Sequence, residues 1–95
     1  MKYSNVVRFK VKEGQLDAVV DSFQNSQYKG LEQQIILKTG DLSLCSIGVW
    51  ESENHMVEAR PEMIAFLDTI RDKLEVLSEE LGVTDPVSGP VIFEA

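Results

Sequence analysis

Two kinds of hydrophobic periodicity alternate along this chain, and their order leaves few folds open to it. Residues 3–12 alternate between apolar and polar side chains, which is typical of a strand with one buried face. Residues 16–23 repeat apolar side chains at i, i+3, i+4 and i+7, which indicates an amphipathic helix. Residues 31–38 and 42–51 then predict two strands, and the Thr-Gly-Asp turn at 39–41 joins them into a hairpin.

The second half of the chain continues this alternation. Ser52 is a candidate N-cap for a short helix over 53–59, and Pro61 is expected to interrupt that helix and begin another. The second helix is predicted to end at Gly82, because an apolar stripe runs through Met63, Phe66, Leu67, Ile70, Leu74, Leu77 and Leu81. Residues 87–94 predict a last strand.

The resulting order, β-α-β-β-α-β, predicts an α+β, ferredoxin-like fold for residues 1–95 as a single domain. In this fold a four-stranded antiparallel sheet carries both helices on one side. The uncovered side is expected to present Val6, Ile36 and Trp50. Because a large apolar sheet face is unusual on a monomer, the sequence predicts a homodimer formed through the sheet faces.

Composition excludes several classes of protein. The chain has 9 Lys and Arg against 16 Asp and Glu, a net charge of −7, which argues against binding to nucleic acid or an anionic membrane. No apolar run approaches the ~20 residues of a membrane span, and the N-terminus lacks an apolar leader, so we expect a cytoplasmic protein. No metal-ligand spacing, phosphate loop or dinucleotide fingerprint is present, so no metal or cofactor is expected.

Three segments carry a resemblance to a known family. They are VRFKVKEGQ at 7–15, VWES at 49–52 and GPVIFE at 89–94. These segments resemble the opening strand, the third strand with its terminal tryptophan, and the closing segment of antibiotic-biosynthesis-monooxygenase-like proteins. The resemblance spans the chain and implies a dimeric α+β barrel, with a cavity between sheet and helices. Members of that family include cofactor-free monooxygenases of polycyclic aromatic phenols, haem-degrading enzymes, isomerases and decarboxylases.

Asn5, Trp50 and His55 suggest the Asn-Trp-His set of the haem-degrading relatives, but the spacing differs. In those proteins the asparagine lies nearer the glycine turn, where this chain has Val7. Their histidine lies further past the tryptophan, near Arg60 of this chain. We therefore do not expect haem degradation, and we interpret Asn5 and Arg60 as candidate substrate-binding residues.

Trp50 is the first candidate for the wall of an aromatic-substrate pocket, and a large anchor in the sheet or dimer core is the alternative. On the third strand it shares a face with Ser46 and Gly48, which leaves room beside the indole. Ile47 and Val49 occupy the other face of this strand and are expected to be ordinary core.

Three further side chains are candidates for chemistry. His55 lies at a helix start, which favours the neutral imidazole and so a general base, or else it is a solvated surface residue. Arg8 could stabilise an enolate as the second catalytic candidate, or pair with Glu32. Tyr28 could bind substrate at the pocket mouth, or pack at an interface.

Two functions follow. The first is a cofactor-independent monooxygenase that acts on a small aromatic or enolisable substrate. The second is a non-catalytic dimeric barrel that binds a small hydrophobic ligand. A cavity smaller than the ~300 Å³ expected of a ligand pocket would remove the first.

Overall fold

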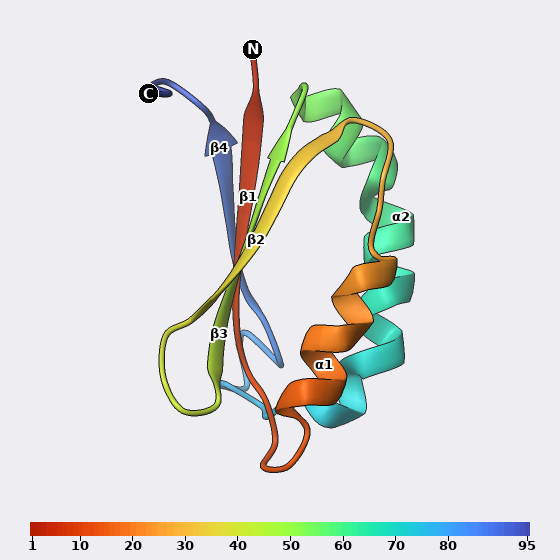
Figure 1. Ribbon diagram of the computed structural model, residues 1–95, viewed down its shortest axis with the longest axis vertical. Coiled ribbons are helices and arrows are strands. Elements are labelled where there is room, and N and C mark those ends of the chain that lie inside the picture. The colour runs from red at the N-terminus through yellow and green to blue at the C-terminus, as the bar shows by residue number, and fades with distance from the viewer.

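The computed structural model describes residues 1–95, apart from the side chain of Asn25. One antiparallel sheet holds four strands in the order β2-β3-β1-β4, and both helices lie on the same side of it (Figure 1). The elements in chain order are β1 (Tyr3–Lys10), α1 (Leu16–Ser22), the 3₁₀ helix η1 (Phe23–Asn25), β2 (Leu31–Lys38), β3 (Ser43–Trp50), α2 (Glu53–Ile70), the 3₁₀ helix η2 (Arg71–Lys73) and β4 (Asp85–Pro90). The predicted ferredoxin-like α+β fold is confirmed. Within the described residues, neither helix combines the length and the apolar character needed to cross a bilayer.

The register of the strands decides which side chains face the helices. Phe9 of β1 lies opposite Leu44 of β3, and both are buried in the core beneath the helices. Because side chains alternate along a strand, Trp50 faces the helices as Leu44 does. Ile36 also packs on the helix side, since a bulge near the start of β2 shifts the pairing of that strand. The prediction that Trp50 and Ile36 lie on the uncovered side is therefore wrong.

The side of the sheet away from the helices, which we name the open face, carries Val6, Ile35, Leu37, Ile47 and Val49. Ile47 pairs with Val6 on one side and with Ile35 on the other, so these three side chains form one row across three strands. Ile35 and Leu37 are exposed. The predicted apolar face therefore exists, with Val6 in it. Ile47 and Val49 were expected to belong to the core, but they lie on the open face.

A single helix, α2, occupies the region where two were predicted. Ser52 caps it as predicted, because its Oγ accepts a hydrogen bond of 3.3 Å from the backbone N–H of His55. Pro61 lies inside this helix and does not break it, so the predicted interruption is wrong. The proline deprives the carbonyl of Val57 of its usual donor, but both residues are exposed and water can solvate that carbonyl.

Replacing Pro61 with alanine is expected to stabilise the protein by about 1–3 kcal/mol, because alanine restores the backbone hydrogen bond to Val57 and removes the clash of the ring with that turn. Urea unfolding followed by circular dichroism measures the change. Glu62→Ala, at the next exposed position, is the control and should shift the free energy of unfolding by less than about 0.5 kcal/mol. A Pro61→Ala protein less stable than the parent would contradict this account.

The predicted continuation of the last helix to Leu81 is also wrong, because α2 ends at Ile70. Beyond η2 the chain turns extended, and Leu74 forms a bridge with Val11 just past the end of β1. Two backbone hydrogen bonds of 2.8 Å flank this bridge. The pairing buries Leu74, whereas Leu77 is exposed, as is Leu81. Tertiary pairing with the sheet therefore replaces the helical turns that the apolar spacing predicted.

The closing strand is displaced toward the N-terminus, since β4 begins before the predicted range of 87–94 and ends at Pro90. Val91 still donates its backbone N–H to the carbonyl of Lys2 at 2.9 Å. The following Ile92 and Phe93 are 90% and 83% exposed. This C-terminal end lies on the side of the sheet away from the helices (Figure 1).

The core beneath the helices is divided into two clusters. The first consists of Phe9, Val11, Val19, Leu44, Ile70 and Leu74. The second consists of Trp50, Met56 and Ala59, with Tyr3, Tyr28, Leu31 and Met63 packed against it. Members of both clusters line one cavity, so the hydrophobic core is interrupted by a hollow at its middle.

Candidate functional site

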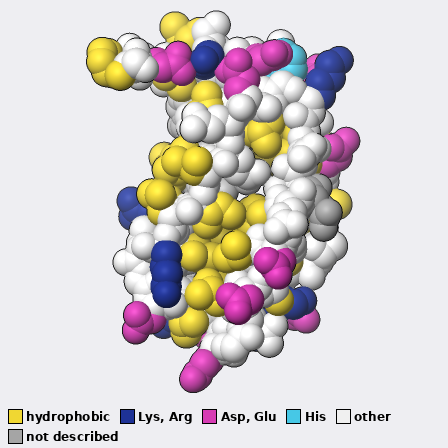
Figure 2. All heavy atoms as spheres, in the orientation of Figure 1, with side chains coloured by type: hydrophobic (Ala, Val, Ile, Leu, Met, Phe, Trp, Pro, Cys, Tyr) yellow, Lys and Arg dark blue, Asp and Glu magenta, His cyan; other side chains and the backbone are white. Residues whose placement is uncertain are grey.

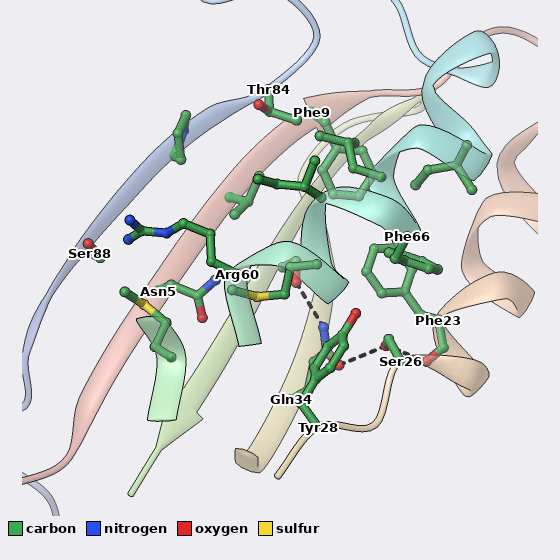
Figure 3. Close-up of a pocket in the computed structure, with 18 of the residues that line it drawn as sticks. Asn5, Phe9, Phe23, Ser26, Tyr28, Gln34, Arg60, Phe66, Thr84 and Ser88 are labelled. Carbon is green, nitrogen blue, oxygen red and sulfur yellow. Dashed lines mark hydrogen bonds between the residues drawn. The ribbon is translucent and has the colours of Figure 1, made fainter. Parts of the chain in front are cut away.

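A cavity of about 560 Å³ opens between the sheet and the helices (Figure 3). Its wall is largely apolar and includes Val7, Phe9, Phe23, Met56, Met63, Ile64, Phe66, Leu67, Ile70 and Leu74. Figure 2 shows hydrophobic side chains gathered in the hollow between sheet and helices. The volume exceeds the ~300 Å³ at which ligand pockets begin, so a small aromatic molecule fits inside.

Phenylalanine rings form one end of this cavity. Phe23 stacks against Phe9 with ring centroids 6.0 Å apart, and it meets Phe66 edge-on at 5.0 Å. The three rings come from β1, η1 and α2, so the fold brings distant parts of the chain together here. A wall of aromatic rings favours a flat, apolar ligand.

A second aromatic pair, Tyr28 and Trp50, lies away from the phenylalanine rings. Tyr28 lines the cavity and stacks on Trp50 with centroids 5.9 Å apart and an angle of 24° between the rings. Trp50 is 1% exposed, and its Nε1–H donates to Oδ1 of Asn5 at 2.7 Å. The indole is therefore a core anchor, the alternative made from the sequence. It does not itself line the cavity but supports two residues that do.

The bond between Asn5 and Trp50 depends on a glycine. Asn5 lies directly opposite Gly48 in the pairing of β1 with β3, on the side of the helices. A Cβ at position 48 would lie only 2.6 Å from Oδ1 of Asn5 and 3.3 Å from Nε1 of Trp50. The missing side chain thus provides the space in which the amide and the indole meet. With Oδ1 occupied by the indole, Asn5 has its amide N–H groups left for a ligand.

Arg60 is the charged residue among the described residues that line the cavity. It projects from α2, and Figure 3 shows its side chain reaching past Asn5 toward β4 and Ser88. None of the ion pairs among the described residues includes Arg60. Its guanidinium is therefore available to an anionic oxygen of a ligand.

Burial raises the pKa of the Tyr28 phenol above its ordinary value, and the negative charge of Glu62 raises it further. Tyr28 therefore stays protonated at neutral pH. A protonated phenol beside the cavity can donate a hydrogen bond to a ligand, whereas it cannot serve as a base.

A chain of three polar side chains interrupts the apolar wall. Ser26 Oγ lies 3.1 Å from Oε1 of Gln34, and Nε2 of Gln34 donates to Oγ of Ser46 at 3.3 Å (Figure 3). All three residues line the cavity. Among the described residues, no buried side-chain nitrogen or oxygen is left without a partner. Each of the three side chains thus has at least one partner within the protein before any ligand binds.

The structure does not bring the two catalytic candidates to this cavity. His55 is held at the start of α2, where its Nδ1 lies 2.7 Å from Oγ of Ser52 and its Nε2 lies 3.3 Å from Glu51. The ring packs against Gly30, where a Cβ would lie 2.4 Å from it. Arg8 points from β1 to the open face and is exposed. Arg8 could hold a substrate only if its face of the strand lined the cavity, and it does not.

Asn5, Tyr28 and Arg60 line the cavity, and Trp50 lies behind two of them. Sequence reasoning missed the polar chain of Ser26, Gln34 and Ser46. The small residues that flank the indole on the third strand were a signal for Ser46, while nothing distinguished Gln34 from the adjacent Gln33. The described residues contain no cluster of side chains suited to hold a metal ion.

No family model matches the sequence, and a search of curated proteins finds no match. Solved structures match nearly all of it. A candidate antibiotic biosynthesis monooxygenase from Chloroflexus aurantiacus has a TM-score of 0.77 at 12% identity, covering 100% of this chain and 97% of that one. SnoaB, a cofactor-independent oxygenase from Streptomyces nogalater, has a TM-score of 0.72 at 15% identity, with coverages of 98% and 95%. A dimeric ferredoxin-like protein from an uncultured marine organism has a TM-score of 0.71 at 12% identity, with coverages of 99% and 90%.

These likenesses show the fold. The chain is similar in structure to antibiotic biosynthesis monooxygenase-like proteins, as the resemblance of its segments indicates, and the similar structures include a dimeric ferredoxin-like protein.

Proposed function

We propose that the chain is a cofactor-independent oxygenase of small aromatic or enolisable compounds. The observation that carries this proposal is the pairing of an aromatic cavity of about 560 Å³ with donor groups of Asn5 and Arg60 in its lining. The likeness in fold to SnoaB, itself a cofactor-independent oxygenase, supports the proposal.

In the proposed reaction the substrate itself supplies the electrons. A hydroxylated arene loses its phenolic proton, and Arg60 stabilises the resulting anion, whose charge is shared with a ring carbon. That carbon transfers electrons to O₂ and forms a carbon–oxygen bond. Loss of water from the peroxide leaves a quinone, so that one hydroxyarene and one O₂ give one quinone and one water. The apolar side chains that line most of the cavity limit the contact of the reactive carbanion with water.

The residues of the cavity have separate roles in this scheme. Arg60 and the amide of Asn5 hold the anionic oxygen, and the protonated phenol of Tyr28 donates a further hydrogen bond. Trp50 fixes Asn5 and Tyr28 in place. Since His55 lies outside the cavity, a water molecule accepts the proton, and Arg60 lowers the pKa of the phenol so that water suffices.

Arg60→Met is expected to lower kcat/KM for oxygen-dependent turnover about 30-fold or more, because it removes the charge that stabilises the anion. Oxygen uptake with a panel of hydroxylated quinone precursors, such as naphthols, measures the effect. Arg71→Met is the matched control, since Arg71 pairs with Asp68 on the exposed end of α2 and should leave the rate unchanged.

Equal rates for the Arg60→Met and parent proteins would remove Arg60 from the mechanism. Ligand binding without oxygen uptake by any member of the panel would favour the second function, a non-catalytic barrel that binds a small hydrophobic ligand. The structure offers one observation in favour of that alternative. No histidine and no carboxylate is among the described residues that line the cavity.

We also propose that two copies associate through their open faces. The row of Val6, Ile47 and Ile35 lies on the side of the sheet away from both helices, where a second sheet can pack against it. The dimeric state of a protein with the same fold supports this assembly.

A further inference from the structure

The polar chain of Ser26, Gln34 and Ser46 is unusual because both of its serines are buried in a wall that is otherwise largely apolar. Ser26 and Ser46 are 4% and 8% exposed, and the wall around them includes Phe23 and Met63. Burying polar side chains is unfavourable unless they are hydrogen-bonded, and an apolar wall would have been simpler to pack. Such a chain therefore points to a use beyond packing.

The hydrogen bonds of this chain can be arranged in two ways. In the first, the amide nitrogen of Gln34 donates to Ser46, and the hydroxyl hydrogen of Ser26 is divided between Oε1 of Gln34 at 3.1 Å and the carbonyl of Phe23 at 2.6 Å. The hydroxyl hydrogen of Ser46 is then free to point into the cavity. In this arrangement Ser46 offers a donor to a ligand.

In the second arrangement the amide of Gln34 is turned by half a revolution. Its nitrogen then donates to Ser26, and Ser26 donates to the carbonyl of Phe23 without dividing its hydrogen. The hydroxyl of Ser46 donates to the amide oxygen of Gln34, and its lone pairs are left for the ligand. In this arrangement Ser46 offers an acceptor. Both arrangements use the same heavy-atom positions, so the exchange requires no movement of the backbone.

We propose that Ser26, Gln34 and Ser46 form a reversible recognition site for one oxygen substituent of a planar aromatic ligand. The site accepts a hydrogen bond when that substituent is a hydroxyl and donates one when it is a carbonyl. The inference rests on the proposed function, because it assumes that an aromatic ligand occupies the cavity. It adds that this ligand carries an oxygen substituent bound by Ser46. A substituent that changes from hydroxyl to carbonyl during oxidation is bound by Ser46 before and after the reaction.

The same cavity has a second polar region, formed by Arg60 and Asn5, which donates hydrogen bonds and does not exchange between donor and acceptor. Arg60 can only donate, and Asn5 adds the N–H groups of its amide, while its oxygen already accepts a hydrogen bond from Trp50. That region suits an anionic oxygen and does not adapt. The ligand class that satisfies both regions is a flat aromatic compound with at least two oxygen substituents, one held by Arg60 and Asn5 and the other by Ser46.

Three probes, titrated under anaerobic conditions so that no oxidation occurs, test the recognition site: 1-naphthol with a hydroxyl, 1-tetralone with a carbonyl, and naphthalene with neither. Quenching of tyrosine and tryptophan fluorescence gives their dissociation constants at about pH 8, where a carboxyl group is ionised. We expect the parent protein to bind 1-naphthol and 1-tetralone with similar affinity, each about tenfold more tightly than naphthalene.

Gln34→Glu is the decisive variant, because a carboxylate only accepts hydrogen bonds and keeps the hydroxyl of Ser46 as its donor. Binding of 1-tetralone should weaken about tenfold, while binding of 1-naphthol is retained. Ser46→Ala should weaken the binding of both oxygenated probes and leave that of naphthalene unchanged. Gln33→Glu is the matched control, since Gln33 is the adjacent, exposed residue and does not line the cavity.

Two results would overturn the proposal: equal weakening of both probes by Gln34→Glu, or no preference of the parent protein for the oxygenated probes over naphthalene. Should Gln34→Glu fail to fold, Ser46→Ala decides the matter alone. Because the assay uses no O₂, its outcome is separate from that of oxygen uptake. If the probes bind in the expected pattern but no compound is oxidised, the recognition site stands and the oxygenase proposal fails. If compounds are oxidised but the probes do not bind in that pattern, the oxygenase proposal stands and the recognition site fails.

Discussion

Replacing Trp50 with alanine is expected to lower the free energy of unfolding by about 3–5 kcal/mol. The indole is 1% exposed, packs against Met56 and Ala59, and stacks on Tyr28. Its removal leaves a void beside an existing cavity, so the surrounding side chains have few neighbours against which to close. Urea unfolding measures the loss. We expect the binding of aromatic probes to weaken as well, because Asn5 loses the partner that fixes it.

Two controls separate the contributions of the ring. Trp50→Phe keeps most of the apolar ring but leaves Oδ1 of Asn5 without its donor, and it should cost about 1–2 kcal/mol. Phe93→Ala removes an aromatic side chain that is 83% exposed and should change stability by less than about 0.5 kcal/mol. A Trp50→Ala protein as stable as the Phe93→Ala protein would show that the indole is not the anchor of its cluster.

Ile47→Asp is expected to convert the proposed dimer into a monomer. A carboxylate in the middle of the row formed with Val6 and Ile35 would have to leave water and enter an apolar contact when two open faces meet, which is costly. The dissociation constant of the dimer should rise at least about 100-fold. Sedimentation or light scattering should give a mass near twice 10.7 kDa for the parent protein and near 10.7 kDa for the variant.

Val57→Asp is the matched control for this change. Val57 is likewise a β-branched residue, and it is exposed, but it lies on α2, on the other side of the molecule from the open face. It should not alter the mass. A parent protein that stays monomeric at micromolar concentration, or an Ile47→Asp protein that stays dimeric, would contradict association through the open face.

The sequence was sufficient for the order and type of the elements, because each strand and helix carries its own periodicity. It was not sufficient for the faces of the sheet. A bulge near the start of β2 reverses the parity of that strand, and on β3 a face with Ser46 and Gly48 turned out to be the buried one. Nor could it locate the end of α2, since the bridge between Leu74 and Val11 that ends the helical pattern is a contact between residues far apart in the chain.

Some residues of the candidate site could be identified from the sequence, and others could not. Asn5 and Arg60 were identified by their positions relative to a family pattern, and both line the cavity. Gln34 could not be identified, because its neighbour Gln33 is the same amino acid and only the strand pairing decides which of the two faces the helices. His55 drew attention as the single histidine, but its bond to Ser52 fixes it at a helix start outside the cavity.

The glycine opposite Asn5 has a consequence for which position of a substrate would be oxidised. Gly48 leaves room for the indole to donate a hydrogen bond to the amide oxygen of Asn5, and this bond fixes the orientation of Asn5. The N–H groups of Asn5 and the guanidinium of Arg60 then make that part of the cavity electropositive. An unsymmetrical aromatic molecule can then satisfy the cavity in one orientation only, with its most acidic oxygen toward Arg60. The absence of a Cβ at Gly48 would in this way determine which position of the substrate is oxidised.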